Sequence, residues 1–199
     1  ARLAGAARRR MSAAADRGHV PWTFRIVRGR IAHEVAAAAE TVDLVIVEGG
    51  VHGAPAQARI GLPARMTIQT LNRPVLILRA GRRLTGPVTV VFDGTALGEK
   101  ALQMADMLTP DNDRLTILFP DQDPEKRTAL ENRAREILGP AGGAAHFRTL
   151  RTASLTALCE AAHGHNAGLL VLDAENALLP RSNMAEILDS LGCPVLLVR

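Results

Sequence analysis

Short apolar runs bounded by turn-forming residues alternate along the chain with longer stretches in which apolar residues recur every three or four positions. The first pattern is typical of strands and the second of helices. Strands are predicted at Trp22–Val27, Asp43–Val47, Pro74–Leu78, Pro87–Phe92, Arg114–Phe119, Ala145–Leu150, Gly168–Leu172 and Pro194–Val198. Helices are predicted at Ala1–Arg17, Arg30–Thr41, Arg65–Leu71, Leu97–Leu108, Pro124–Leu138, Ser154–His163 and Asn183–Leu191. Several strands are apolar on both faces, which indicates helices on both sides of parallel sheets. The fold class is therefore predicted to be α/β, with doubly wound parallel sheets.

The second half of the sequence repeats part of the first. Arg73–Arg79 (Arg-Pro-Val-Leu-Ile-Leu-Arg) recurs 120 positions later as Cys193–Arg199 (Cys-Pro-Val-Leu-Leu-Val-Arg), and Val45–Glu48 matches Leu170–Asp173. A repeat of this length predicts two units, residues 1–84 and residues 85–199. The second unit has five predicted strands and the first has only the last three. By the repeat, two strands of the first unit would precede Ala1, so this unit is predicted to be truncated.

The residues Val90-Val91-Phe92-Asp93-Gly94-Thr95, followed by a helix with Ala101-Leu102, resemble the opening strand, turn and helix of the universal stress protein family. The last element, Cys-Pro-Val-Leu-Leu-Val, is also similar to the family's closing strand. The resemblance implies an adenine nucleotide alpha hydrolase-like unit of five parallel strands and four helices. It also implies a regulatory protein, since the family is stress-related and many members bind ATP. Their phosphate loop, Gly-x2-Gly-x9-Gly-Ser/Thr, follows the fourth strand, and an Asp at the end of the first strand contacts the nucleoside.

The second unit departs from this nucleotide-binding pattern. From Asp173 to Asn183 the chain contains no glycine, and Asp173 and Glu175 stand where phosphates would need backbone amides. Two carboxylates there would repel a triphosphate. Asp93, Gly94 and Thr95 are retained, but these residue types also serve as a strand-to-helix turn with a helix cap. The second unit is therefore predicted to have lost ATP binding.

The first unit departs from the pattern in another way. Gly50 and Gly53 fit Gly-x2-Gly, but Gly61 follows after seven residues and not nine, and Leu62-Pro63 replaces the Ser or Thr. The candidate nucleotide-binding residues are consequently Asp93, Gly94, Thr95, Gly50, Gly53 and Gly61. No cofactor is assigned, although ATP or another adenine nucleotide is a possible ligand.

Composition and charge exclude several classes of function. Residues 1–84 hold 14 basic and 5 acidic residues, but the arginines are scattered, aromatic residues make up only 3% of the chain, and no nucleic-acid motif is present, so no nucleic-acid partner is expected. No apolar run approaches the roughly 20 residues that span a bilayer. The chain lacks a Gly-x-Ser-x-Gly elbow, a phosphate-binding P-loop and a zinc-protease motif, and its cysteines and histidines show no metal-site spacing, which argues against an enzyme and a metal site.

These features predict a cytoplasmic, non-catalytic regulatory or binding protein with degenerate nucleotide-binding motifs. The two units are expected to form a pseudo-dimer in which Pro74–Leu78 and Pro194–Val198 pair antiparallel, and two chains are expected to form a homodimer. Two alternatives are a cytoplasmic regulatory domain of a transporter and an ATP-binding stress protein whose site needs the missing N-terminal segment. An ATP-hydrolysing enzyme is a third, disfavoured by the lack of a phosphate loop.

Overall fold

A computed structural model describes residues 2–48, 62–79, 84–110, 114–140, 145–164, 167–180 and 184–199. Helices and strands alternate along these residues. The helices are α1 (Arg2–Gly18), α2 (Ile31–Ala39), α3 (Leu62–Thr70), α4 (Ala96–Leu108), α5 (Pro124–Leu138), α6 (Leu155–Gly164) and α7 (Met184–Leu191). The strands are β1 (Val45–Glu48), β2 (Val75–Leu78), β3 (Val88–Val91), β4 (Thr116–Phe119), β5 (His146–Thr149), β6 (Leu169–Asp173) and β7 (Val195–Val198). The predicted α/β fold class is confirmed.

The strands form one continuous seven-stranded sheet in the order β1-β2-β7-β6-β3-β4-β5. Neighbouring strands run parallel except at the contact between β2 and β7, where they run antiparallel. The prediction of parallel sheets therefore holds on either side of that contact, and the whole is a single mixed sheet. The antiparallel pairing predicted between the strands at residues 74–78 and 194–198 is present in the structure.

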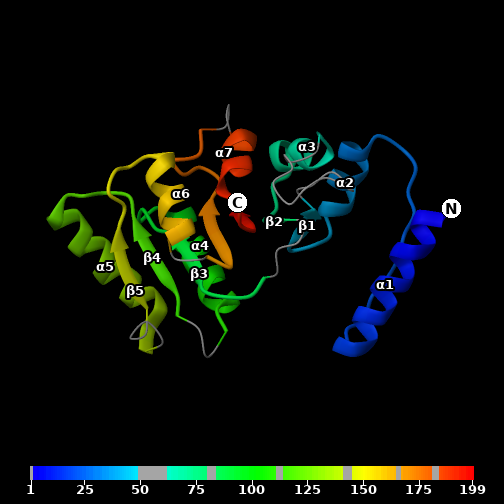
Figure 1. Ribbon diagram of the computed structural model, residues 1–199, viewed down its shortest axis with the longest axis horizontal. Helices are drawn as coiled ribbons and strands as arrows, with labels where there is room; N and C mark the ends of the chain where they lie inside the picture. The colour runs from blue at the N-terminus through cyan, green and yellow to red at the C-terminus, as the bar shows by residue number, and fades with distance from the viewer. Residues whose placement is uncertain are drawn as a thin grey trace.

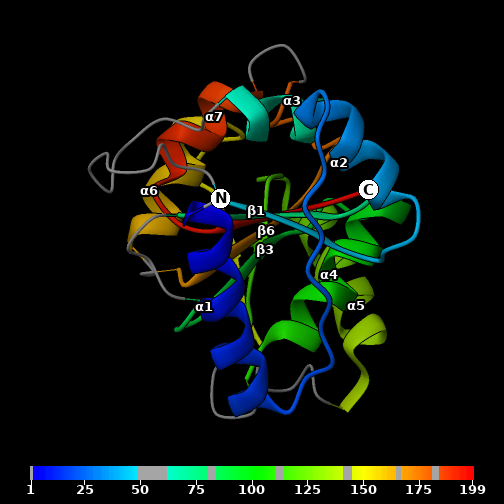
Figure 2. The same cartoon turned by 90° about the vertical axis from the view of Figure 1, so that its right-hand side faces the viewer.

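Helices cover both faces of the sheet, because most strand residues carry apolar side chains and these point to both faces. Figures 1 and 2 show α2, α3, α6 and α7 on one face and α4 and α5 on the other. Each layer has its own core. Val75, Ile77, Val195 and Leu197 pack with the first group of helices, whereas Leu76 and Leu196 pack with the second. No described helix has an apolar stretch long enough to cross a membrane.

The strand predicted at residues 22–27 is wrong. These residues form an irregular segment between α1 and α2, and Ile26 is 70% exposed. As the first of the three strands predicted for the first unit, it corresponds to the third strand of the second unit, β5, which pairs with β4. In the first half, residues 2–18 ahead of the segment are helical and offer no strand to pair with, so its backbone cannot form a ladder. Figure 1 shows α1 standing apart from the sheet, beyond the edge formed by β1.

The β2–β7 contact joins the two halves with a symmetric set of interactions. Leu76 is paired with Leu196, and the flanking pairs are Val75 with Leu197 and Ile77 with Val195. Arg79 at the end of β2 donates a hydrogen bond to the Leu188 carbonyl oxygen in α7, and Arg199 after β7 donates one to the Ile68 carbonyl oxygen in α3. Each arginine thus reaches across the contact to the last helix of the other half. Arg79 and Arg199 are separated by the 120 positions of the repeat, and so are Ile68 and Leu188.

Candidate functional site

Two aspartates lie near one another at the carboxyl ends of β3 and β6, because these two strands are parallel neighbours. Asp173 is the last residue of β6, and Asp93 follows β3 by two residues. Carboxyl ends of adjacent parallel strands open into the same crevice, which is where doubly wound sheets bind their ligands. The predicted site residue Asp93 therefore lies beside this crevice.

Asp93 and Thr95 organise the turn that begins α4. The Asp93 Oδ1 atom accepts hydrogen bonds from the Thr95 amide at 3.0 Å and from the Thr95 hydroxyl at 2.7 Å. The hydroxyl in turn accepts from the Gly98 amide at 3.0 Å and caps the helix. Gly94 has a φ of +81°, and a Cβ there would lie 2.6 Å from Leu130 Cδ2, so the turn requires glycine. The Asp93 Oδ1 atom and the Thr95 hydroxyl are therefore committed to local structure.

Asp173 organises the loop after β6 in a similar way. Its Oδ1 accepts from the Glu175 amide at 3.0 Å, and its Oδ2 accepts from the Asn176 side-chain amide at 2.8 Å. The Asn176 Oδ1 accepts from the Leu178 amide at 3.1 Å. Asp173 and Asn176 are only 1% and 3% exposed. The loop is thus folded around two buried polar side chains.

Burial raises the pKa of the Asp173 carboxyl above its ordinary value, and the nearby negative charge of Asp93 raises it further. The hydrogen bond from Asn176 opposes this shift without cancelling it. A carboxyl group in this position resists ionisation because desolvation and a like charge both disfavour the anion. The end of the cleft at β3 and β6 therefore disfavours additional negative charge.

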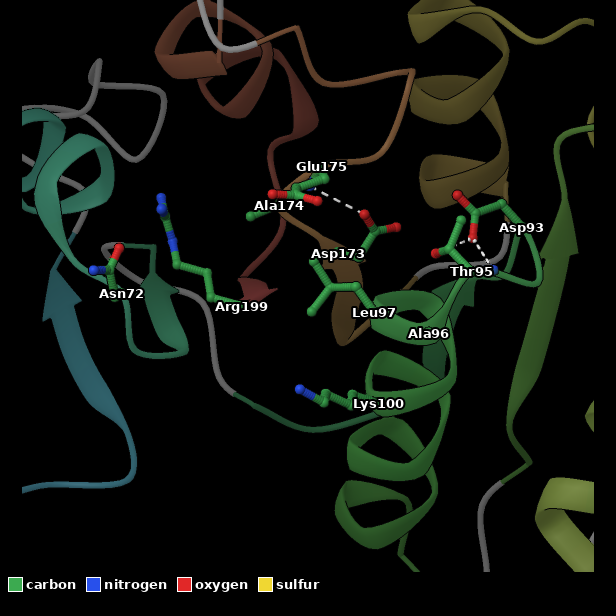
Figure 3. A pocket seen from close by; sticks show the side chains of 10 residues that line it. All are labelled: Asn72, Asp93, Thr95, Ala96, Leu97, Lys100, Asp173, Ala174, Glu175 and Arg199. Carbon is green, nitrogen blue, oxygen red and sulfur yellow. Dashed lines mark hydrogen bonds between the residues drawn. The ribbon is translucent and has the colours of Figure 1, made fainter.

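The aspartates form one part of an open cleft of about 580 Å³. Its lining comprises Asn72, Asp93, Thr95, Ala96, Leu97, Lys100, Asp173, Ala174, Glu175 and Arg199. Figure 3 shows Asp93 and Asp173 on one side of Leu97 and the side chains of Lys100 and Arg199 on the other. Asn72, which follows α3, comes from the first half of the chain, so both halves contribute to the cleft. The described residues contain no group of three or more His, Cys, Asp or Glu arranged to hold a metal ion.

The structure locates only some of the predicted site residues. Asp93 and Thr95 line the cleft, and Gly94 shapes the turn between them. The other three, Gly50, Gly53 and Gly61, lie outside the described residues. Sequence reasoning missed Lys100, Arg199 and Asn72. Lys100 is one of only two lysines in the chain, which was an available signal. Asn72 and Arg199 line the cleft because β2 and β7 pair, and no local sequence motif marks either residue as a cleft residue.

The molecule thus has a doubly wound α/β sheet with a cleft at the carboxyl ends of its strands, and known proteins were compared with its sequence and its fold. No family model and no curated protein matches the sequence. A universal stress protein from Archaeoglobus fulgidus DSM 4304 matches with a TM-score of 0.61 and 19% identity, covering 83% of this chain and 64% of that one. A candidate universal stress protein from Pseudomonas aeruginosa UCBPP-PA14 matches with a TM-score of 0.63 and 17% identity, covering 97% and 77%. A functionally unknown protein from Pseudomonas aeruginosa PAO1 has a TM-score of 0.63 and 16% identity, covering 97% and 76%.

The chain therefore has the universal stress protein fold, as the motif at Val90–Thr95 predicted. It spans less than two thirds of the Archaeoglobus protein. At identities below 20% the similarity concerns the fold.

Proposed function

We propose that this chain is a cytoplasmic, non-catalytic regulatory protein of the universal stress type, and that its cleft does not bind a nucleoside triphosphate. The observation that carries the proposal is the hydrogen bonding of the loop after β6. This loop occupies the place of the family's phosphate loop, and five amides of its described residues already donate hydrogen bonds within the chain.

The donated amides are those of Ala174, Glu175, Asn176, Leu178 and Leu179. Two of them donate to side chains, Glu175 to Asp173 and Leu178 to Asn176. A phosphate-binding loop works because successive backbone amides point toward the anion. Here a triphosphate would have to displace bonds to buried side chains, each of which would then lose a partner at a cost of about 1–3 kcal/mol.

Electrostatics also disfavour a triphosphate. Asp93 and Asp173 lie at the carboxyl ends of neighbouring strands, and each raises the cost of negative charge at this end of the cleft. Unit charges about 4 Å apart repel by roughly 4 kcal/mol at the effective dielectric of a protein surface. The cleft therefore fits a ligand with a different charge pattern.

The proposal of a non-catalytic role is supported by the state of the hydroxyl group in the cleft. Nucleophilic catalysis needs a hydroxyl with an adjacent base and a free approach to substrate. The Thr95 hydroxyl donates to Asp93 and accepts from the Gly98 amide, so both of its hydrogen-bonding roles serve the helix cap. Activation of this group would dismantle the beginning of α4.

We also infer that the chain is a tandem pair of related units that forms a homodimer. The symmetric β2–β7 register and the exchanged arginine contacts support the tandem arrangement. β1 is the edge strand at one end of the sheet, and Ile46 on it is 57% exposed. Among the described residues no strand pairs with the outer side of β1, and such an edge favours association. Light scattering tests this inference, and a monomeric mass across a concentration series would contradict it.

Isothermal titration with Mg·ATP and a phosphate-release assay test the central proposal. We expect no saturable heat at ATP concentrations up to about 1 mM, which corresponds to a binding free energy weaker than about 4 kcal/mol, and no phosphate release above buffer. An ATP-binding protein of the same fold, measured in parallel, is the positive control. Binding at micromolar ATP, or hydrolysis that scales with protein concentration, would overturn the proposal.

A further inference from the structure

We propose that the cleft binds a small zwitterion, with a cationic group held by Asp93 and Asp173 and an anionic group held by Lys100 and Arg199. Such a ligand needs a binding cleft and not an active site, so this assignment rests on the proposed function. It adds the chemical class of the ligand and the residues that receive each of its ends.

The acidic end of the cleft is built to receive a cation. Asp93 and Asp173 project from adjacent parallel strands into the same space (Figure 3). Both are held by hydrogen bonds that fix their direction, from Thr95 to Asp93 and from Asn176 to Asp173. An ammonium or guanidinium group between them would offset the repulsion of two like charges. A cation therefore gains more here than at a single exposed carboxylate.

The basic end of the cleft comes from two other elements. Lys100 lies on α4, beyond the capped first turn, and Arg199 follows β7. The amide side chain of Asn72 lines the same end. Lysine and arginine side chains with a neighbouring amide donor are suited to a carboxylate or a single phosphate.

Apolar side chains and one further carboxylate lie between the two ends. Figure 3 shows Leu97 between Asp173 and Lys100, and it shows Ala174 beside the side chain of Glu175 between Asp173 and Arg199. A ligand that reaches both ends must therefore carry its charges on a spacer whose carbon atoms can contact Leu97 and Ala174. Neither a simple anion nor a simple cation would use both ends, and each would meet an uncompensated group of its own sign.

Ligand binding at the basic end would also connect the two halves. Arg199 donates to the Ile68 carbonyl oxygen in α3, and Asn72 lies two residues after the end of that helix. An anionic group bound at this position would contact residues from both sides of the β2–β7 contact. We therefore expect a ligand to stabilise the whole fold against thermal unfolding, because it binds the assembled native state.

The experiment uses the full chain and a series of ω-amino acids from glycine to aminooctanoate. The matched controls are the alkylamine and the alkanoate of each length, which carry one charge only. We expect at least one ω-amino acid to raise the melting temperature and to give saturable heat, whereas neither monofunctional compound of that length does. If no member of the series binds, or if the amine or the carboxylate binds equally well, the proposal is wrong.

Two pairs of variants locate the site. Lys100→Met and Asp173→Asn are each expected to weaken binding about tenfold or more, since each removes a charged partner from one end. Lys126→Met and Asp106→Asn, which lie outside the cleft, are expected to leave it unchanged. Circular dichroism and melting of the free variants verify folding. Equal losses in Lys100→Met and Lys126→Met would contradict the assignment.

These outcomes are separate from those that test the proposed function. A silent ATP titration together with failure of the whole zwitterion series would overturn only the ligand assignment. Micromolar ATP binding would overturn the proposed function, whatever the ω-amino acids do.

Discussion

Leu76 is paired with Leu196 at the centre of the antiparallel contact between β2 and β7. The two residues occupy the same position in the repeated segments, 120 residues apart. Both are buried and pack with apolar residues of α4 and α5. A pairing centred on equivalent residues is what a local two-fold axis requires, since each strand then presents the same neighbours to the other.

The first prediction concerns this central pair. Leu76→Ala and Leu196→Ala are each expected to lower the free energy of unfolding by about 2–5 kcal/mol, because each removes buried apolar volume. Because the residues are paired across adjacent strands, the double variant should depart from additivity by about 0.5 kcal/mol or more. Urea unfolding measures all three variants. Met107→Ala, at a side chain that is 75% exposed, is the control and should change stability by less than about 0.5 kcal/mol.

The second prediction concerns the ion pairs beside this contact. Asp189 in α7 lies 2.6 Å from Arg65 and 3.9 Å from Arg79, whose side chain is only 5% exposed. Asp189→Ala removes this carboxylate from the buried Arg79 guanidinium, and we expect a loss of about 3–5 kcal/mol in unfolding free energy. Glu160→Ala disrupts the exposed pair with Arg151 and should cost at most about 1 kcal/mol. Similar losses in the two variants would show that burial of the pair is unimportant.

The third prediction separates backbone strain from steric contact at two glycines. Gly94 and Gly139 both have positive φ, +81° and +59°, and the ψ of −142° at Gly139 lies close to a region that is essentially restricted to glycine. At Gly94 a new Cβ would approach Leu130 Cδ2 to 2.6 Å, whereas at Gly139 nothing lies within 4 Å. Both alanine variants should therefore destabilise by about 1 kcal/mol or more in thermal and urea unfolding, at Gly139 through backbone strain alone. An unchanged stability of Gly139→Ala would refute this account.

The fourth prediction follows from the raised pKa of Asp173. Burial and the charge of Asp93 make the native carboxyl harder to ionise than the unfolded one. Stability from this group is therefore fully present below the unfolded pKa of about 4 and is lost as the pH rises through the higher native pKa. The asparagine in Asp173→Asn cannot ionise. The stability of this variant relative to wild type should therefore be higher at pH 7 than at pH 4.

Asp121 provides a control of opposite sign for that experiment. A hydrogen bond from the Asp123 amide, with help from Lys126, lowers the pKa of the Asp121 carboxyl. Its contribution to stability is present above the unfolded pKa and is lost as the pH falls through the lower native pKa. The stability of Asp121→Asn relative to wild type should therefore be lower at pH 7 than at low pH. The same pH trend in both variants would contradict the assigned shifts.

Much of the fold was predictable from local pattern. The apolar runs at β6 and β7, the cap of α4 at Thr95 and the proline at the beginning of α5 all place elements close to their observed bounds. The strand at residues 22–27 was mispredicted because its composition suits a strand, while its formation depends on a neighbour. A strand has no internal hydrogen bonds, so pattern alone cannot establish that it will pair.

The sequence by itself determined the order of helices and strands, the turn at Asp93-Gly94-Thr95 and the repeated final strand, because these depend on neighbouring residues and on burial of periodic apolar side chains. Only the tertiary structure decided that Asp173 faces the same cleft as Lys100 and Arg199. Those side chains come from three elements, and parallel pairing of β3, β6 and β7 is what brings them together. The loop after β6 shows the same division. Its lack of glycine was visible in the sequence, whereas the donation of its amides to Asp173 and Asn176 depends on how the folded chain buries these two side chains.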